Sequence, residues 1–168
     1  AGELKKSYTT LDVLSPSDFT VVDQNGNEVL GAVKSFALAR GGETVEAVNG
    51  KFEFKKSGDY TFRYIATVNG ETVEKAYNFT VTDKTVPVIT VEGTVYKTGV
   101  KNKFVKIASF TAADNESSVN MLTNVTFYGE EINVFEGKFI PEEAGEYLVT
   151  FKAVDEDGNV SEYSYVIN

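Results

Sequence analysis

The sequence contains no cysteine, no histidine and no tryptophan. Without cysteine it can form no disulfide, no thiolate nucleophile and no cysteine-ligated metal site. Without histidine it lacks the side chain that most often acts as general base near neutral pH. Carboxylates and lysines remain, but they fall in expected turns and on the polar faces of expected strands, where solvated charge explains them. We therefore predict that the chain is not an enzyme.

Positive charge is also scarce. Sixteen lysines and arginines face 25 aspartates and glutamates, which gives a formal net charge of -9. The acidic residues are spread along the chain, whereas nucleic-acid binding needs a basic footprint. No stretch approaches the roughly 20 apolar residues that span a bilayer. We expect a soluble chain that binds no nucleic acid and does not insert into membranes.

A repeat organises the sequence. Gly50-Lys51-Phe52 and Ser57-Gly58-Asp59-Tyr60 recur, at the same spacing, as Gly137-Lys138-Phe139 and Ala144-Gly145-Glu146-Tyr147. The two copies are offset by 87 positions, read directly from these numbers. The segment 82–87, which ends in a proline, interrupts the strand pattern between the copies. The repeat thus predicts two domains, residues 1–83 and 84–168.

Each copy carries the alternation of apolar and polar residues that is typical of a half-buried strand. It is clearest directly after each tyrosine, at 60–66 and 147–153. Asn-Gly and Asp-Gly pairs in the turns that follow provide the positive φ angles of tight hairpins. No segment has a sustained helical period, so the expected fold class is all-β. The expected strands also include 19–22, 33–39, 77–81, 88–91, 104–112, 119–128 and 163–167.

Four segments of the second copy, in this order and spacing, resemble a bacterial immunoglobulin-like domain of the kind repeated along cell-surface proteins. They are Asp83 to Ile89, Phe110 to Asn115, Ala144 to Tyr147 and Ala153 to Asn159. The first copy keeps only Gly58-Asp59-Tyr60 of this pattern. The resemblance implies two tandem immunoglobulin-like β-sandwiches, a secreted or cell-surface location, and roles such as spacing, adhesion or docking. The short segment between the copies leads us to expect an elongated arrangement.

Tyr60 and Tyr147 fit a tyrosine corner, in which the phenol near the start of a strand bonds back to the backbone. A plain core tyrosine is the alternative. The cysteine that follows two residues later in antibody domains is replaced here by Phe62 and Val149, so apolar packing must take the place of the disulfide.

The acidic turn 155–159 suggests calcium, which prefers several oxygen ligands, although its glycine does not stand where an EF-hand loop requires it. A simple hairpin turn is the competing interpretation. If the linker and loops converge at one end of the second sandwich, they could hold a cation that stiffens the junction. The candidate ligands are Asp83, Asp114, Asp155 and Asp157, and no other cofactor is expected.

The function favoured by these observations is a non-catalytic spacer or adhesion module of a bacterial secreted or cell-surface protein, monomeric when isolated. The alternative is a carbohydrate- or protein-binding module, because aromatic rings stack on sugars. Most tyrosines stand at alternate positions of the expected strands, where packing in the core or on a sheet face accounts for their presence. The tyrosines outside that period are Tyr8, Tyr96 and Tyr128. An intramolecular crosslink between a lysine and an asparagine beside a carboxylate was also considered, but no spacing in the sequence marks such a set of residues.

Overall fold

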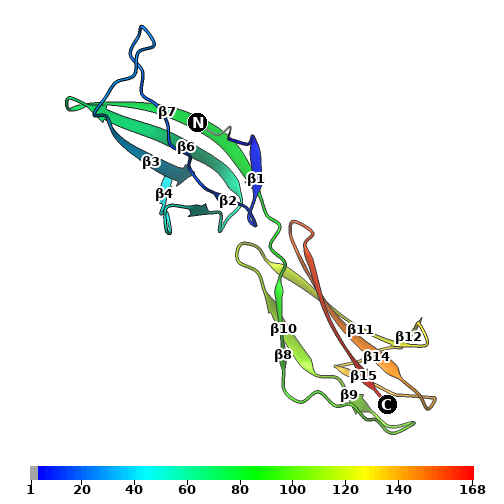
Figure 1. Ribbon diagram of the computed structural model, residues 1–168. Helices are drawn as coiled ribbons and strands as arrows, with labels where there is room; N and C mark the ends of the chain where they lie inside the picture. Colours follow the sequence, from blue (N-terminus) through cyan, green and yellow to red (C-terminus); the bar gives the residue numbers. More distant parts are fainter. Residues whose placement is uncertain (1–3) are drawn as a thin grey trace. The chain divides into compact units, whose positions relative to one another are not determined.

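The computed structural model describes residues 4–168, which form an all-β protein of two compact units (Figure 1). The first unit extends to Lys84 and the second runs from Thr85 to Asn168, one residue later than the boundary expected from the repeat. No helix forms within residues 4–168, and hence none that could cross a membrane. The expected fold class is correct.

The first unit is a sandwich of one large and one small sheet. The large sheet has the strand order β1-β7-β6-β3-β4, in which β1 runs parallel to β7 and the other pairs are antiparallel. The small sheet pairs β2 with β5. The strands are β1 (Ser7–Thr9), β2 (Val13–Leu14), β3 (Val33–Arg40), β4 (Glu43–Val45), β5 (Phe52–Glu53), β6 (Gly58–Val68) and β7 (Glu71–Thr82).

The core of this unit forms around β6, whose alternate side chains point between the sheets as the sequence predicted. Tyr60, Phe62, Tyr64 and Ala66 are all buried. Aromatic rings from both sheets surround them, and Phe52 meets Phe62 edge-on at 6.0 Å between centroids. Burial of such a side chain stabilises the fold by about 1.5–3 kcal/mol.

The hairpin between β6 and β7 has the two-residue turn that Asn-Gly predicts. Asn69 and Gly70 adopt φ angles of 51° and 85°, both left-handed, and Val68 pairs with Glu71 across the turn. This geometry matches the twist of the flanking strands, so the turn fixes the register of the longest pair in the unit.

The second unit repeats the arrangement, with two pairs of strands instead of one opposite its large sheet. Its large sheet has the order β12-β11-β14-β15, and its other face is made by the pairs β10-β8 and β13-β9. The strands are β8 (Val88–Glu92), β9 (Val105–Lys106), β10 (Ser109–Ala113), β11 (Val119–Phe127), β12 (Glu130–Glu131), β13 (Lys138–Phe139), β14 (Tyr147–Asp155) and β15 (Val160–Ile167).

Strand β14 plays the part of β6, again as predicted from the alternation. Tyr147, Val149, Phe151 and Ala153 are buried between the sheets. Phe110 of β10 stacks on Phe151 with 4.2 Å between ring centroids. Phe62 and Val149, which stand where antibody domains have a cysteine, are fully buried, so apolar packing joins the two sheets at this point.

Two expected strands differ from the structure. The segment 19–22 is not a strand, because its only bridge within residues 4–168 joins Val22 to Glu28 and a ladder needs a continuous partner. The strand expected over 104–112 is divided into β9 and β10. Between them Ile107 donates its N–H to the Gly137 carbonyl and Ala108 to the Tyr165 hydroxyl, so the ladder changes partner there.

The tyrosines near the starts of β6 and β14 bond back to the backbone four residues earlier. The Tyr60 hydroxyl donates to the Lys56 carbonyl at 2.6 Å, and the Tyr147 hydroxyl donates to the Glu143 carbonyl at 3.0 Å. The Tyr147 oxygen also accepts the Glu143 N–H at 3.2 Å. These bonds hold the connection that enters each central strand, as in a tyrosine corner.

We predict that Tyr147→Phe lowers the free energy of unfolding of the second unit by about 1–2 kcal/mol, because two backbone groups lose their partner. Urea unfolding followed by amide resonances of β14 measures this. Tyr163→Phe is the matched control, since Tyr163 lies in the same unit with its side chain partly exposed. Equal effects of the two substitutions would show that the Tyr147 hydroxyl does not matter.

Asp12 closes the turn after β1. Its Oδ2 accepts the Thr9 N–H at 2.8 Å and the Thr9 hydroxyl at 3.0 Å, and Lys5 Nζ lies 3.4 Å from Oδ1. These contacts, first of all the Thr9 N–H, hold the pKa of Asp12 below its ordinary value of 3.8. The ionised form is therefore favoured in the folded state.

Because the folded pKa is depressed, the stabilisation by Asp12 is present above pH 3.8 and is lost as the pH falls through the lower folded value. We predict that Asp12→Asn destabilises the first unit at pH 7 and that the difference from the original chain shrinks in acid. Thermal unfolding of the first unit across this range checks it. A difference that stays constant down to the acid limit would contradict the role of the charge.

Candidate functional site

The residues after β10 form a turn that is built around Asp114. Its Oδ1 accepts the N–H groups of Glu116 at 2.9 Å and Ser117 at 3.3 Å. Its Oδ2 is buried and accepts no hydrogen bond within residues 4–168. A buried carboxylate oxygen without a donor is costly, which marks this atom as a candidate ligand for a cation.

Asp155 ends β14 at the acidic turn seen in the sequence. It is buried, and its two oxygens accept the Asn159 N–H and the Asn159 side-chain amide, each at 2.8 Å. Gly158 has a φ of 82°, so the segment does form a hairpin-like turn. Asp155 can accept these two hydrogen bonds and also bind a cation, because each carboxylate oxygen has a second lone pair.

Asp83 follows β7 directly and is fully buried. Its Oδ1 accepts the Thr10 hydroxyl at 2.9 Å, and the same hydroxyl oxygen accepts the Lys84 N–H at 2.9 Å. Asp83 is therefore fixed by the residues around the end of β7.

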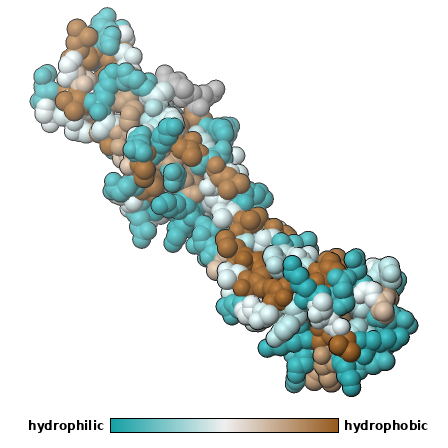
Figure 2. Space-filling view, turned by 60° about the horizontal axis from the view of Figure 1, so that its bottom comes forward, coloured by the Kyte–Doolittle hydropathy of each residue, from teal (hydrophilic) through white to brown (hydrophobic). Residues whose placement is uncertain are grey.

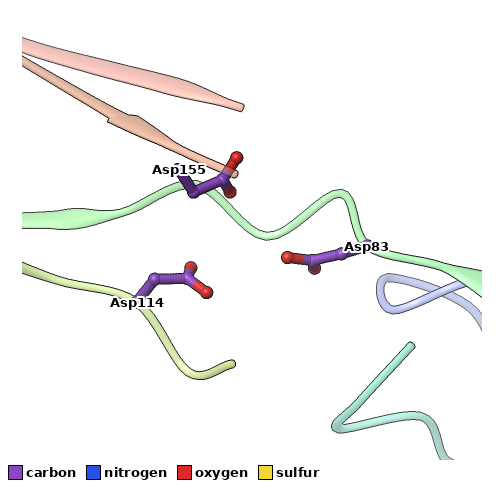
Figure 3. A group of neighbouring side chains, drawn as sticks. All are labelled: Asp83, Asp114 and Asp155. Atoms are coloured by element: carbon purple, nitrogen blue, oxygen red, sulfur yellow. The ribbon is translucent and has the colours of Figure 1, made fainter. Parts of the chain in front are cut away.

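Two of the four predicted ligands, Asp114 and Asp155, come together in the second unit. Each offers one carboxylate oxygen, and these oxygens lie within 4.8 Å of each other (Figure 3). Asp83 belongs to the first unit. Calcium binds oxygen at 2.3–2.6 Å, so two oxygens on one ion stand at most about 5 Å apart. The spacing fits a calcium ion. Asp157 is exposed and is not part of the group.

The aromatic residues considered for sugar binding are not assembled into a platform. Tyr8 is buried in the first core, where its ring contacts Phe54 and Phe79. Tyr96 and Tyr128 are exposed, but the ring contact of Tyr128 within residues 4–168 is to its neighbour Phe127. Tyr60 and Tyr147 are buried in the cores of the two units.

The two units share a second sequence match, which the repeat of 87 positions does not include. Asp18-Phe19-Thr20-Val21-Val22-Asp23 matches Ser109-Phe110-Thr111-Ala112-Ala113-Asp114 with an offset of 91. The longer connection before β3 changes the offset from 87, so a single repeat length does not find it. The packing agrees with the match, since Phe19 meets Tyr64 at 5.1 Å as Phe110 meets Phe151.

Asp23 is thus the counterpart of Asp114 in the first unit. Its Oδ1 accepts the N–H groups of Asn25 at 2.8 Å and Asn27 at 2.9 Å. The Asn27 N–H, above all, lowers the pKa of Asp23 from 3.8. Asp23 is exposed, and among the described residues of the first unit it has no acidic partner of the kind that Asp114 has in Asp155.

The first unit has an open groove of about 410 Å³ beside the segment 19–21. One wall is this segment, and the other is formed by residues of β6 and β7. Apolar groups reach the surface of each unit in patches bordered by hydrophilic ones (Figure 2). The lining residues are Phe19, Thr20, Val21, Tyr64, Ala66, Val73, Glu74, Lys75 and Tyr77.

No family model and no curated protein matches the sequence. Among solved structures, the fibronectin(III)-like modules of Clostridium thermocellum CbhA are similar at 16% identity, over 96% of this chain and 87% of theirs, with a TM-score of 0.38. Protocadherin Gamma B2 extracellular cadherin domains 3-6 align at 15% identity, over 98% of this chain and 45% of that one, with a TM-score of 0.40. The Bacteroides ovatus glucan utilization protein SGBP-B, solved with a mixed-linkage heptasaccharide, aligns at 12% identity, over 96% and 42%, with a TM-score of 0.32. These TM-scores are low, so the similarities carry no argument about function.

Proposed function

We propose that the chain is a non-catalytic structural, spacer or adhesion module of a bacterial secreted or cell-surface protein, working outside the cell as a monomer. The observation that supports it best is the way in which each unit joins its first segment to its last strand. Pairing of this kind determines how a unit responds when its two ends are pulled apart.

In the first unit β1 pairs with the end of β7 in parallel, with Ser7 opposite Thr80 and Thr9 opposite Thr82. The Thr10 N–H then donates to the Thr82 carbonyl at 3.0 Å. A pull on the two ends of this unit acts along the two strands in opposite directions, across their hydrogen bonds. The bonds are loaded together rather than one after another, which raises the force needed to separate them.

The second unit repeats this pairing. The Gly99 N–H donates to the Asn168 carbonyl at 2.7 Å, and the Asn168 N–H donates to the Lys97 carbonyl at 2.9 Å, which is the pattern of a parallel bridge. Both units therefore resist extension in the same way, as a load-bearing spacer requires.

We predict that Thr10→Pro lowers the force at which the first unit unfolds and leaves the second unit unchanged, because proline has no N–H to donate to Thr82. Single-molecule extension of the full chain measures both events, since forced unfolding reports the unfolding rate. Thr10→Val is the matched control, because it removes the same hydroxyl and keeps the N–H. Equal forces for the two variants would contradict the shear role of this bond.

As a second function, we propose that the second unit binds calcium through Asp114 and Asp155. The support is the buried Oδ2 of Asp114 together with the 4.8 Å grouping of the carboxylate oxygens. No lysine or arginine forms an ion pair with Asp114 or Asp155 within the described part of the chain. A divalent ion would supply the missing positive charge and would relieve the repulsion among the carboxylates.

We predict that calcium raises the melting temperature of the full chain and that Asp114→Asn abolishes this rise, because binding to the folded state alone stabilises it. Calorimetric titration with calcium chloride gives the affinity. Asp23→Asn is the control, since it changes the equivalent turn of the first unit, and Asp157→Asn tests the exposed candidate. A rise that survives in Asp114→Asn, or no rise in the original chain, would refute the site.

A further inference from the structure

The second unit has a groove of its own, which is formed by a single loop. Every residue that lines it lies in the segment 96–106, and its volume is about 350 Å³. The loop reverses at a turn where the Lys103 N–H donates to the Val100 carbonyl at 3.1 Å and Asn102 has a left-handed φ of 58°. The Asn102 N–H donates to the Pro141 carbonyl at 2.8 Å, which ties the turn to the chain outside the loop. Both arms of the loop line the groove.

The two arms, 96–100 and 103–106, are held in place by backbone hydrogen bonds and by close packing. The Gly99 N–H and the Lys97 carbonyl both pair with Asn168. A side chain at Gly99 would place its Cβ 2.8 Å from Cγ2 of the buried Val105, so glycine lets the two arms approach this closely. Because the arms are ordered before anything binds, an occupant loses little free energy in ordering them.

Three large apolar side chains of the groove are exposed to solvent. Tyr96 is 48%, Val100 is 65% and Phe104 is 69% exposed. Tyr96 and Val100 belong to the first arm and Phe104 to the second, so each arm presents apolar surface and an aromatic ring. A concave site with aromatic side chains and a few polar groups is typical of small-ligand and sugar binding.

The charge of the groove is positive, in contrast to the rest of the chain. The segment 93–113 contains no acidic residue, and its four lysines are Lys97, Lys101, Lys103 and Lys106. Lys103 and Lys106 line the groove and form no ion pair within residues 4–168, whereas Lys101 is paired with Glu143 at 3.7 Å. Lys138 lies opposite Lys106 in the β13-β9 register and adds a further positive charge. The groove thus favours an occupant that carries an anionic group.

The rest of the molecule restricts the kind of anion that can bind. The formal net charge is -9, so a dense polyanion such as a nucleic acid is repelled by the chain as a whole. A peptide strand needs a regular edge to pair with, but the arm 96–100 is not a strand, and its Gly99 N–H and Lys97 carbonyl are already paired. A polysaccharide that contains acidic sugars meets both restrictions, because its charges are spaced along the chain and its rings have apolar faces.

We propose that this groove binds an acidic polysaccharide. Tyr96 and Phe104 lie against the faces of its sugar rings, and Lys103 and Lys106 pair with its carboxylates. The inference rests on the adhesion role proposed above and gives that role a class of ligand. Both lysines are exposed, so their charge-assisted hydrogen bonds to the carboxylates are weakened by added salt.

The test adds oligosaccharides of three uronate polymers, namely polygalacturonate, alginate and hyaluronan, to the ¹⁵N-labelled full chain. We expect saturable shifts of amide resonances in 96–106 with at least one of them, weakened by salt and lost when its carboxylates are methyl-esterified. Phe104→Ala and Lys106→Gln should each weaken binding about tenfold, because each removes one kind of contact. Phe135→Ala and Lys101→Gln are the matched controls. Phe135 is 71% exposed in the same unit, Lys101 lies in the same loop, and neither lines the groove.

The absence of shifts with all three oligosaccharides at millimolar concentration would overturn the proposal. Equal effects of Phe104→Ala and Phe135→Ala, or of Lys106→Gln and Lys101→Gln, would also overturn it. The same holds for shifts of these amides with hexaglutamate or with vesicles of anionic phospholipid in place of the oligosaccharides, because the occupant would then be an acidic peptide or a membrane surface. The unfolding forces are measured without any ligand, so failure of this groove and failure of the spacer role are told apart.

Discussion

The packing of one alternating strand in each unit is the interaction on which the rest of the structure depends. Strands β6 and β14 are central in their sheets, and each turns four consecutive inward residues to the core. Without a disulfide, apolar contact from this strand does most of the work of holding the two sheets together. A central strand with one buried face fixes its own register, because a shift by one residue would expose the whole apolar set.

The strands next to β6 and β14 could be predicted from the sequence, whereas most of the short strands farther from them could not. The alternation after Tyr60 and Tyr147 and the Asn69-Gly70 turn are local signals, so β6, β7, β14 and β15 could be predicted. The short strands β1, β2 and β5 have two or three residues each and are defined by partners distant in sequence. The segment 19–22 shows the opposite case. It has the composition of a strand, and even the same motif as β10, but a ladder needs a neighbour that local sequence does not reveal.

The acidic group could be predicted in part, for a physical reason. Asp114 directly follows β10 and Asp155 ends β14, and the two strands end at the same edge of the second sandwich, so the topology makes the two residues neighbours. Asp157 looks equivalent in sequence, yet Gly158 turns the chain so that Asp155 is buried while Asp157 faces solvent. Asp155 and Asp157 are only two positions apart, yet one is a candidate ligand and the other a surface charge. Only the folded turn shows which of the two points inward.

The two units share one arrangement and differ at one edge of the sandwich. In the second unit β8 lies between β10 and β15, so the chain itself closes the apolar side of the sheet. In the first unit Val73 is exposed on the corresponding side, beside Lys75. The pairing of β1 with β7 lies at the other end of β7, at Thr80 to Thr82, so the proposed resistance to extension does not depend on whether Val73 is covered.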